Sequence, residues 1–182
     1  MSGFRALSPN INVNTESGQL RTELQNTFAR LDGELQLAPY RVAVGTGPVG
    51  NVTTSETDLV TYTVTYDVLS KTNSSLLIFA SGKTAANANN KTLKLVLGST
   101  TLFTSGALAS NNIDWTLQAE ILRVGAASQI VWAQFLRNGS SPIVTTTTTA
   151  VDMSVNNTLK LTGTGTASSD ISYYSWKILL LT

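Results

Sequence analysis

Short runs in which apolar and polar residues alternate strictly constrain the fold of this chain more than any other feature. Leu93, Leu95 and Leu97 recur at every second position after an Asn- and Ala-rich turn, within the stretch GKTAANANNKTLKLVLG of residues 82–98. The segment 60–68 repeats the pattern with Val and Tyr against Thr. A spacing of two places alternate side chains on opposite faces of a strand, so these runs predict β-strands with one buried and one solvated face.

The alternation continues to the end of the chain, and no helical segment interrupts it. The predicted strands are 57–68, 76–80, 92–97, 100–103, 112–124, 128–137, 143–151, 158–162 and 171–181. Strands without helical crossovers pair antiparallel, and two sheets must face each other to bury their apolar sides. The sequence therefore predicts an all-β antiparallel sandwich of the jelly-roll type, with about eight to nine strands.

The last predicted strand, ISYYSWKILLL, is apolar at both parities. One set of alternate residues is Tyr174, Trp176, Ile178 and Leu180. A strand of this kind needs cover on both faces, and a large exposed apolar surface indicates an interaction site. We expect this set to form a subunit interface on the outer side of one sheet. The alternative is a central strand covered by a long loop.

The first 50 residues lack the alternation and form a separate predicted region. Residues 1–16 read as an irregular polar arm, which is either disordered or laid against a partner. Its apolar residues are Phe4, Leu7, Ile11 and Val13. Residues 17–37 are the one helical candidate, with Ser17 placed to cap the helix.

Apolar residues of the predicted helix have the spacing of a coiled-coil seam. They are Leu24, Phe28, Leu31 and Leu35. About one and a half heptads cannot hold a coiled coil alone, because isolated helices shorter than about 12 to 15 residues are marginal. The helix therefore either self-associates with help from the domain that follows, or docks on its own domain or on a neighbour.

Residues 39–51 are predicted to be a glycine-rich linker, and they contain a misleading motif. Gly45, Gly47 and Gly50 spell G-x-G-x-x-G, which binds a pyrophosphate only between a strand and a helix. Pro48 lies inside the motif and β-like sequence follows it, so we expect a hinge and no nucleotide site. The predicted organisation is an N-terminal region 1–50 and a jelly-roll domain 51–182.

Composition removes several function classes. The chain has no cysteine and no histidine, which excludes disulfides, thiolate nucleophiles, the usual zinc sites and a base with a near-neutral pKa. A serine nucleophile would then need lysine as its base, and no S-x-x-K occurs. With a net charge of +1 there is no broad cationic field for nucleic acid. We expect a non-enzymatic protein without catalytic, cofactor or metal residues.

The sequence also indicates no targeting signal and no membrane-spanning segment. Residues 1–7 do not have the apolar run of a secretory signal, and no stretch approaches the roughly 20 apolar residues of a membrane span. We therefore expect no membrane partner and synthesis in the cytoplasm.

Two pairs of carboxylates are candidate chemical sites. Glu56 and Asp58 would share a strand face about 7 Å apart, which suits a cation or an acid pair less well than a solvated strand entry. Asp114 and Glu120 would lie about 20 Å apart on one strand, beyond the spacing of glycosidase carboxylates.

Aromatic residues and the Asn-rich turn are the remaining candidates for a ligand site. Five aromatic residues could stack on sugar rings, although core or interface positions are commoner: Trp115, Trp132, Tyr173, Tyr174 and Trp176. Four polar residues of the turn could bind a polar ligand, with turn formation as the simpler role: Asn87, Asn89, Asn90 and Lys91.

Three segments have a characteristic order of residues: GKTAANANNKTLKLVLGSTTLFTSGAL, DWTLQAEILRVGAASQIVWAQF and LKLTGTGTASSDISYYSWKILLL. Together they resemble a jelly-roll module that recurs in virion proteins of tailed bacteriophages, over about residues 57–182. The most specific part is A-N-A-N-N-K-T-L-K-L, followed by the Gly98 turn, a tryptophan-led strand and an Arg-x-Gly turn at residues 123–125.

The resemblance implies a homotrimeric, non-catalytic protein of the virion, either a capsid decoration (cement) protein or a fibre. The short N-terminal region favours a decoration protein that grips the shell through residues 1–44. The apolar residues of the arm would then bind the major capsid protein or another virion protein, and the helix seam would hold the trimer. The alternative is a short tail or head fibre whose β domain binds a host-surface glycan.

Overall fold

The computed structural model describes residue 27 and residues 40–109, 111–138 and 140–182. The chain divides into two compact units, residues 1–38 and Pro39–Thr182, and the second unit contains every described strand. Two sets of predicted functional residues lie outside the described residues. They are the arm residues Phe4, Leu7, Ile11 and Val13, and the helix-seam residues Leu24, Phe28, Leu31 and Leu35.

The second unit consists of strands and their connections. The strands are β1 (Tyr40–Gly50), β2 (Thr57–Val64), β3 (Ser75–Thr84), β4 (Asn90–Leu97), β5 (Thr100–Thr104), β6 (Leu108–Ala109), β7 (Asp114–Gly125), β8 (Ser128–Arg137), β9 (Ser140–Thr149), β10 (Asn157–Thr164) and β11 (Ile171–Leu181). The nine predicted strands correspond to β2–β5 and β7–β11, and the structure adds β1 and the short β6.

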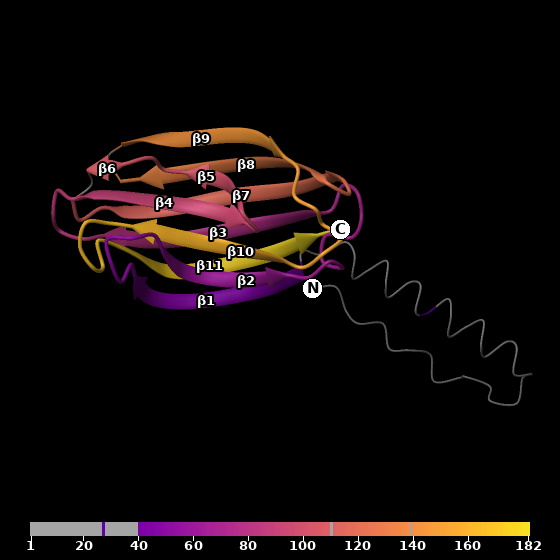
Figure 1. The fold of residues 1–182 in the computed structure, drawn as a ribbon, viewed down its shortest axis with the longest axis horizontal. Helices are drawn as coiled ribbons and strands as arrows, with labels where there is room; N and C mark the ends of the chain where they lie inside the picture. Colours follow the sequence, from indigo (N-terminus) through magenta and orange to yellow (C-terminus); the bar gives the residue numbers. More distant parts are fainter. Residues whose placement is uncertain (1–26, 28–39, 110, 139) are drawn as a thin grey trace, which may run out of the picture. The chain divides into compact units, whose positions relative to one another are not determined.

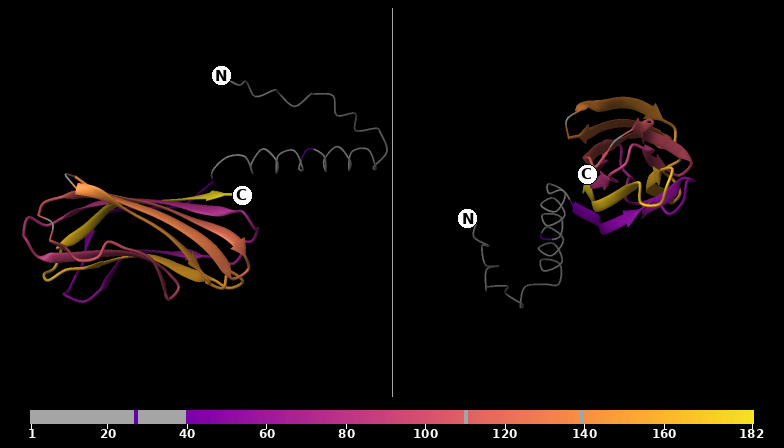
Figure 2. Two further views of the ribbon diagram at one scale, coloured as in Figure 1. Left: turned by 90° about the horizontal axis from the view of Figure 1, so that it is seen from above. Right: turned by 90° about the vertical axis from the view of Figure 1, so that its left-hand side faces the viewer.

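The strands form two antiparallel sheets that stack face to face (Figures 1 and 2). The six-stranded sheet has the order β1-β11-β3-β7-β8-β9, and the five-stranded sheet has the path β2-β10-β4-β5 with β6 paired to β4. The predicted all-β antiparallel sandwich is thus confirmed. In each sheet a strand from the end of the chain, β11 or β10, lies between two strands from its first half.

The core lies between the two sheets and takes alternate residues from their strands. Leu93, Leu95 and Leu97 of β4 are completely buried, as the spacing of two predicted. From the other sheet, the ring of Phe135 lies 5.8 Å from that of Phe103 and 6.0 Å from that of Trp115, measured between centroids. Aromatic pairs at this separation add to the burial of apolar surface, so the centre of the sandwich is held by all three rings.

The predicted glycine-rich linker is wrong, because residues 40–50 form the edge strand β1. β1 pairs along its length with β11, from Tyr40 opposite Leu180 to Gly50 opposite Ser172. Gly47 is needed for close approach to β11, since a Cβ there would lie 2.0 Å from the carbonyl oxygen of Tyr173. The G-x-G-x-x-G motif is followed by a connection to β2 and by no helix, so it lacks the geometry of a dinucleotide site.

The predicted interface set on β11 also needs correction, because a β-bulge changes the parity of the strand. Tyr173 pairs with Gly82 and Ser175 with Ser81, so Tyr174 is the extra residue. Beyond the bulge, Trp176 and Ile178 point into the core and are buried, and Leu180 packs against the core. Of the four predicted interface residues, only Tyr174 lies on the surface.

The pairing of β1 leads to a prediction about the domain boundary. A protein of residues 39–182 should unfold cooperatively, whereas one of residues 51–182 should lose about 3 kcal/mol or more of unfolding free energy. The shorter protein lacks β1, so the edge of β11 is unpaired and the core near Trp176 and Ile178 is uncovered. Urea unfolding of both proteins measures the difference, and equal midpoints with equal slopes would show that β1 is dispensable.

Candidate functional site

Asp170, in the connection between β10 and β11, is completely buried and organises its surroundings. Its carboxylate accepts hydrogen bonds from the side-chain amides of Asn87 at 2.8 Å and Asn89 at 3.1 Å. The backbone N–H groups of Thr166 and Ala167 donate to it as well, both at 2.8 Å. Burial by itself raises the pKa of Asp170, but the hydrogen bonds, led by that from Asn87, lower the pKa to about 2.

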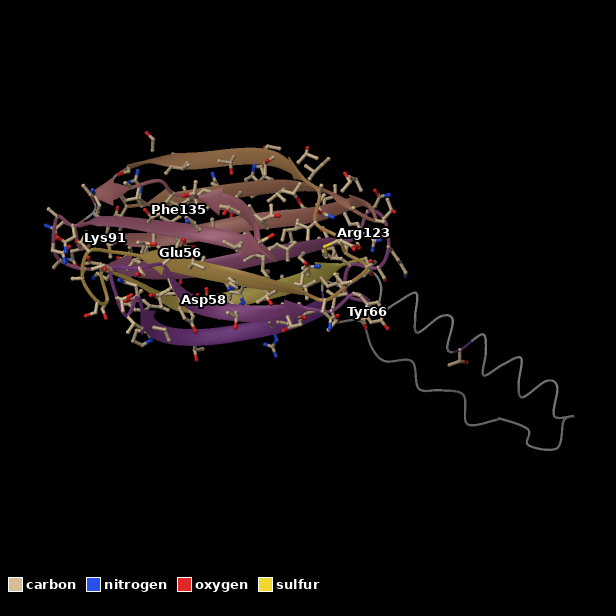
Figure 3. The ribbon with its side chains drawn as sticks, in the orientation of Figure 1. Glu56, Asp58, Tyr66, Lys91, Arg123 and Phe135 are labelled. Carbon is tan, nitrogen blue, oxygen red and sulfur yellow. The ribbon has the colours of Figure 1, made fainter. Side chains whose placement is uncertain are left out.

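Lys91 fills the inside of the Asn-rich turn and is completely buried. Its Nζ donates to the backbone carbonyl oxygen of Asn87 at 2.8 Å, to Oδ1 of Asn87 at 2.7 Å and to the carbonyl oxygen of Asn89 at 2.8 Å. Three acceptors match the three protons of an ammonium group. Desolvation lowers the pKa of Lys91, and the negative charge of Asp170 opposes this shift. Figure 3 shows Lys91 at one end of the sandwich.

Asn51 joins a third connection to the same cluster. Its Nδ2 donates to the carbonyl oxygens of Thr53 at 2.9 Å and Ala167 at 2.8 Å, and its Oδ1 accepts from the N–H of Ile171 at 3.0 Å. We call Asn51, Asn87, Asn89, Lys91 and Asp170 the loop clamp. It ties together the connections β1–β2, β3–β4 and β10–β11, each of which crosses between the sheets.

The loop clamp directs its polar groups to the protein itself. Among the residues predicted to bind a polar ligand or to form the turn, Asn87, Asn89 and Lys91 therefore have a structural role, and Asn90 is exposed. Sequence reasoning did not single out Asn51 or Asp170. A lone carboxylate in the otherwise uncharged TGTASSD segment is the signal that could have drawn attention to Asp170.

Glu56 and Asp58 each pair with a lysine on the outer side of the five-stranded sheet. Nζ of Lys94 lies 2.6 Å from Oε2 of Glu56, and Nζ of Lys160 lies 3.1 Å from Oδ2 of Asp58. The hydrogen bonds from Lys94 and then Thr162 lower the pKa of Glu56. Both carboxylates are thus ion-pair partners of lysines and remain partly exposed, in keeping with the predicted solvated strand entry. Figure 3 shows Glu56 and Asp58 close to β10.

The second carboxylate pair stays apart. Asp114 lies opposite Lys83 at one end of the β3–β7 pairing, and Glu120 lies opposite Leu77 farther along. Within the described ranges, no group of three or more His, Cys, Asp or Glu side chains could hold a metal ion. Asp114 and Glu120 thus lie six residues apart along β7, as predicted.

The five aromatic candidates divide between core and surface. Trp115, Trp176 and Tyr173 are buried, whereas Trp132 on β8 and Tyr174 on β11 are exposed. β3 and β7 lie between β8 and β11 in the sheet, so the two exposed rings do not form one stacking platform.

The outer side of the five-stranded sheet, which we call the polar face, is covered by polar side chains. One row of neighbouring residues across β2, β10, β4 and β5 contains Thr61, Lys160, Val96 and Thr101. None of the large apolar side chains that are exposed in the described residues belongs to these four strands. Threonines and ion pairs cover this face, as expected of a sheet surface in contact with water.

The outer side of the six-stranded sheet, which we call the apolar face, has a different character. One row of neighbours from β1 to β9 is Arg41, Leu179, Leu77, Glu120, Trp132 and Thr146. The next row is Val44, Lys177, Phe79, Gln118, Gln134 and Val144. Of the eleven large apolar side chains that are exposed among the described residues, the face carries five: Val44, Ile130, Trp132, Leu136 and Val144. Four of them lie on the neighbouring strands β8 and β9, and a cluster of exposed apolar side chains of this kind indicates an interaction site.

A hollow of about 480 Å³ opens on the apolar face over β11, β3, β7 and β8. Small hydroxyl residues lie in a row along it, with Ser81 next to Ser175 and Thr116. Oγ of Ser81 and Oγ of Ser175 are hydrogen-bonded at 2.8 Å. The larger side chains of Phe79 and Leu136 also line the hollow. Sequence reasoning expected an interface on the outer side of one sheet but assigned it to residues of the last strand, and it did not single out Ser81, Thr116 or Leu136.

No protein-family model matches the chain, and no curated protein matches it in sequence. In the part of the chain that the structure describes, no helix has the length and apolar character needed to cross a membrane.

The loop clamp predicts a stability effect for Asp170→Asn. The amide cannot accept from all the N–H groups that surround the carboxylate, so several buried donors lose their partner. We expect a loss of about 2 to 4 kcal/mol of unfolding free energy in urea at neutral pH. Asp152→Asn is the matched control, because Asp152 is exposed and its carboxylate accepts hydrogen bonds from Ser154, two residues away. Equal losses for both variants would contradict the structural role of the clamp.

The pH dependence of stability tests the same carboxylate. The pKa of Asp170 is about 2 in the folded protein and ordinarily 3.8, so the folded state binds fewer protons. Its contribution, about 2 kcal/mol, is therefore fully present above the ordinary pKa and is lost as the pH falls toward the folded-state pKa. The difference in unfolding free energy between the unsubstituted protein and Asp170→Asn should shrink over that range. A difference that stays constant would contradict the assignment.

Proposed function

We propose that this chain is a non-enzymatic structural protein of a bacteriophage virion, made in the host cytoplasm. In this proposal it is a capsid decoration (cement) protein that assembles as a homotrimer and binds the major capsid protein through its N-terminal arm. The observation that carries the proposal is the contrast between the two outer faces of the sandwich. One face is polar and ion-paired, and the other has the apolar surface expected of a protein that functions in an assembly.

Two further observations support the proposal. The polar groups of the Asn-rich turn, which is the most specific part of the resemblance to phage virion proteins, bind one another in the loop clamp and hold the sandwich together. The sequence contains no histidine and no cysteine, so the commonest acid–base group and the thiol nucleophile are missing.

The start of β1 at Tyr40 sets the best truncation for a test of capsid binding. The full chain should sediment with capsids that lack it, whereas residues 39–182 should fold but stay in the supernatant. Replacement of Phe4, Leu7, Ile11 and Val13 by serine in the full chain should also abolish binding. Replacement of Asn10 and Asn12 by alanine, in the same arm, is the matched control and should leave binding intact.

Two results would count against the proposal. Capsid binding by residues 39–182 would show that the arm is not the anchor. Binding of the full chain to host cells, with none to capsids, would support the alternative, a short tail or head fibre whose β domain binds a host-surface glycan.

A further inference from the structure

We propose that the apolar face is the surface through which copies of this chain contact one another, in a head-to-tail ring. The part of the face that carries Trp132 of β8 and Val144 of β9 in one copy covers the hollow of the next copy. This inference rests on the proposed homotrimer and adds the location and the polarity of its interface. It does not require that the trimer binds a capsid.

The first argument is that the same face carries both a depression and apolar side chains outside it. The short residues Ser81, Thr116 and Ser175 lie in one row among the residues that line the hollow. Farther along the sheet, toward β9, Trp132 and Val144 are exposed at 38% and 52%. Large exposed side chains beside a depression let one copy fill the depression of the next, and a head-to-tail contact of this kind can close into a ring.

The second argument is the distribution of charge across the face. Lys177 on β11 lines the hollow, and Arg41 lies one strand farther out on β1. Glu120 on β7 is the direct neighbour of Trp132. None of these three charged side chains has an ion-pair partner among the described residues. When Trp132 of one copy enters the hollow of the next, Glu120 approaches the basic side of that hollow, so the two halves of the face are complementary in charge.

The third argument is the comparison with the opposite face. The carboxylates there, Glu56 and Asp58, already pair with Lys94 and Lys160 within one chain. The charged side chains named there are thus paired within one chain, whereas the apolar face leaves Lys177, Arg41 and Glu120 without an ion pair among the described residues and its large apolar side chains exposed. A second copy supplies apolar cover and opposite charge together, which solvent does not.

Thiol crosslinking of the full chain tests the arrangement, because the chain has no cysteine of its own. Ser81→Cys places a thiol in the lining of the hollow, and Trp132→Cys places one on the β8 side. The double variant, treated with a short bismaleimide, should give covalent oligomers up to three chains on a denaturing gel. Each single variant should give much less of these oligomers, since in a head-to-tail contact position 81 of one copy faces position 132 of the next and not position 81.

Other crosslinking results would overturn the proposal. A single variant that crosslinks as completely as the double variant would show a symmetric contact in place of a head-to-tail one. No oligomer from the double variant would show that copies do not meet on this face. A crosslink between Ser81→Cys and a cysteine at Leu31 would show that the predicted helix covers the hollow instead.

Association measured without crosslinking gives a second test. Phe79→Lys and Trp132→Lys in the full chain should raise the dissociation constant of the oligomer by about 30-fold or more in sedimentation experiments, because both side chains would be central to the contact. Val96→Lys, an equivalent change on the polar face, is the control and should leave the oligomer unchanged. Thermal melting confirms that each variant is folded.

The outcomes separate this inference from the proposed function. Monomeric but folded Phe79→Lys protein together with an unchanged Val96→Lys oligomer supports the interface, whether or not capsids bind the protein. An oligomer that resists both Phe79→Lys and Trp132→Lys overturns the interface, even if the protein decorates capsids. Binding of a soluble oligosaccharide in the hollow of the assembled protein would likewise overturn it, since the hollow would then be open.

Discussion

The buried carboxylate of Asp170 is the interaction on which the arrangement of the two sheets depends. It draws hydrogen bonds from two asparagines of the β3–β4 connection, while Asn51 of the β1–β2 connection binds the backbone on either side of it. All three connections cross from one sheet to the other at the same end of the sandwich. A buried charge is costly unless it is fully hydrogen-bonded, so the clamp fixes these crossings to one geometry.

The clamp and the topology act together. β10 and β11 each lie between strands from the first half of the chain, and the segment that joins them carries Asp170. The six-stranded sheet can thus form completely only when the last strand is in place between β1 and β3. This explains why the chemistry of the Asn-rich turn is structural: its amides and its lysine hold a fold whose long-range pairings have no disulfide to support them.

Because the polar side chains of the loop clamp bind one another and the backbone, the outer faces of the sheets are the better candidates for function. The polar face resolves its charges within one chain through Lys94–Glu56 and Lys160–Asp58. The charged side chains of the apolar face form no such ion pairs among the described residues. We place the contact between copies on this face because of its hollow and the large side chains beside it. Assembly through a sheet face agrees with a protein whose proposed role is structural.

The sequence by itself determined the class of fold and the positions of nine strands, because a spacing of two directly reports which side of a strand is buried. It also excluded histidine and cysteine chemistry. Only the tertiary structure decided the rest. A bulge at Tyr174 moved Trp176 and Ile178 into the core, and pairing with β11 turned a glycine-rich segment into β1. Asp170 and Asn51 acquired their roles from partners far away in the chain. Bulges, edge pairing and buried polar contacts depend on which distant segments meet, and a local pattern does not contain that information.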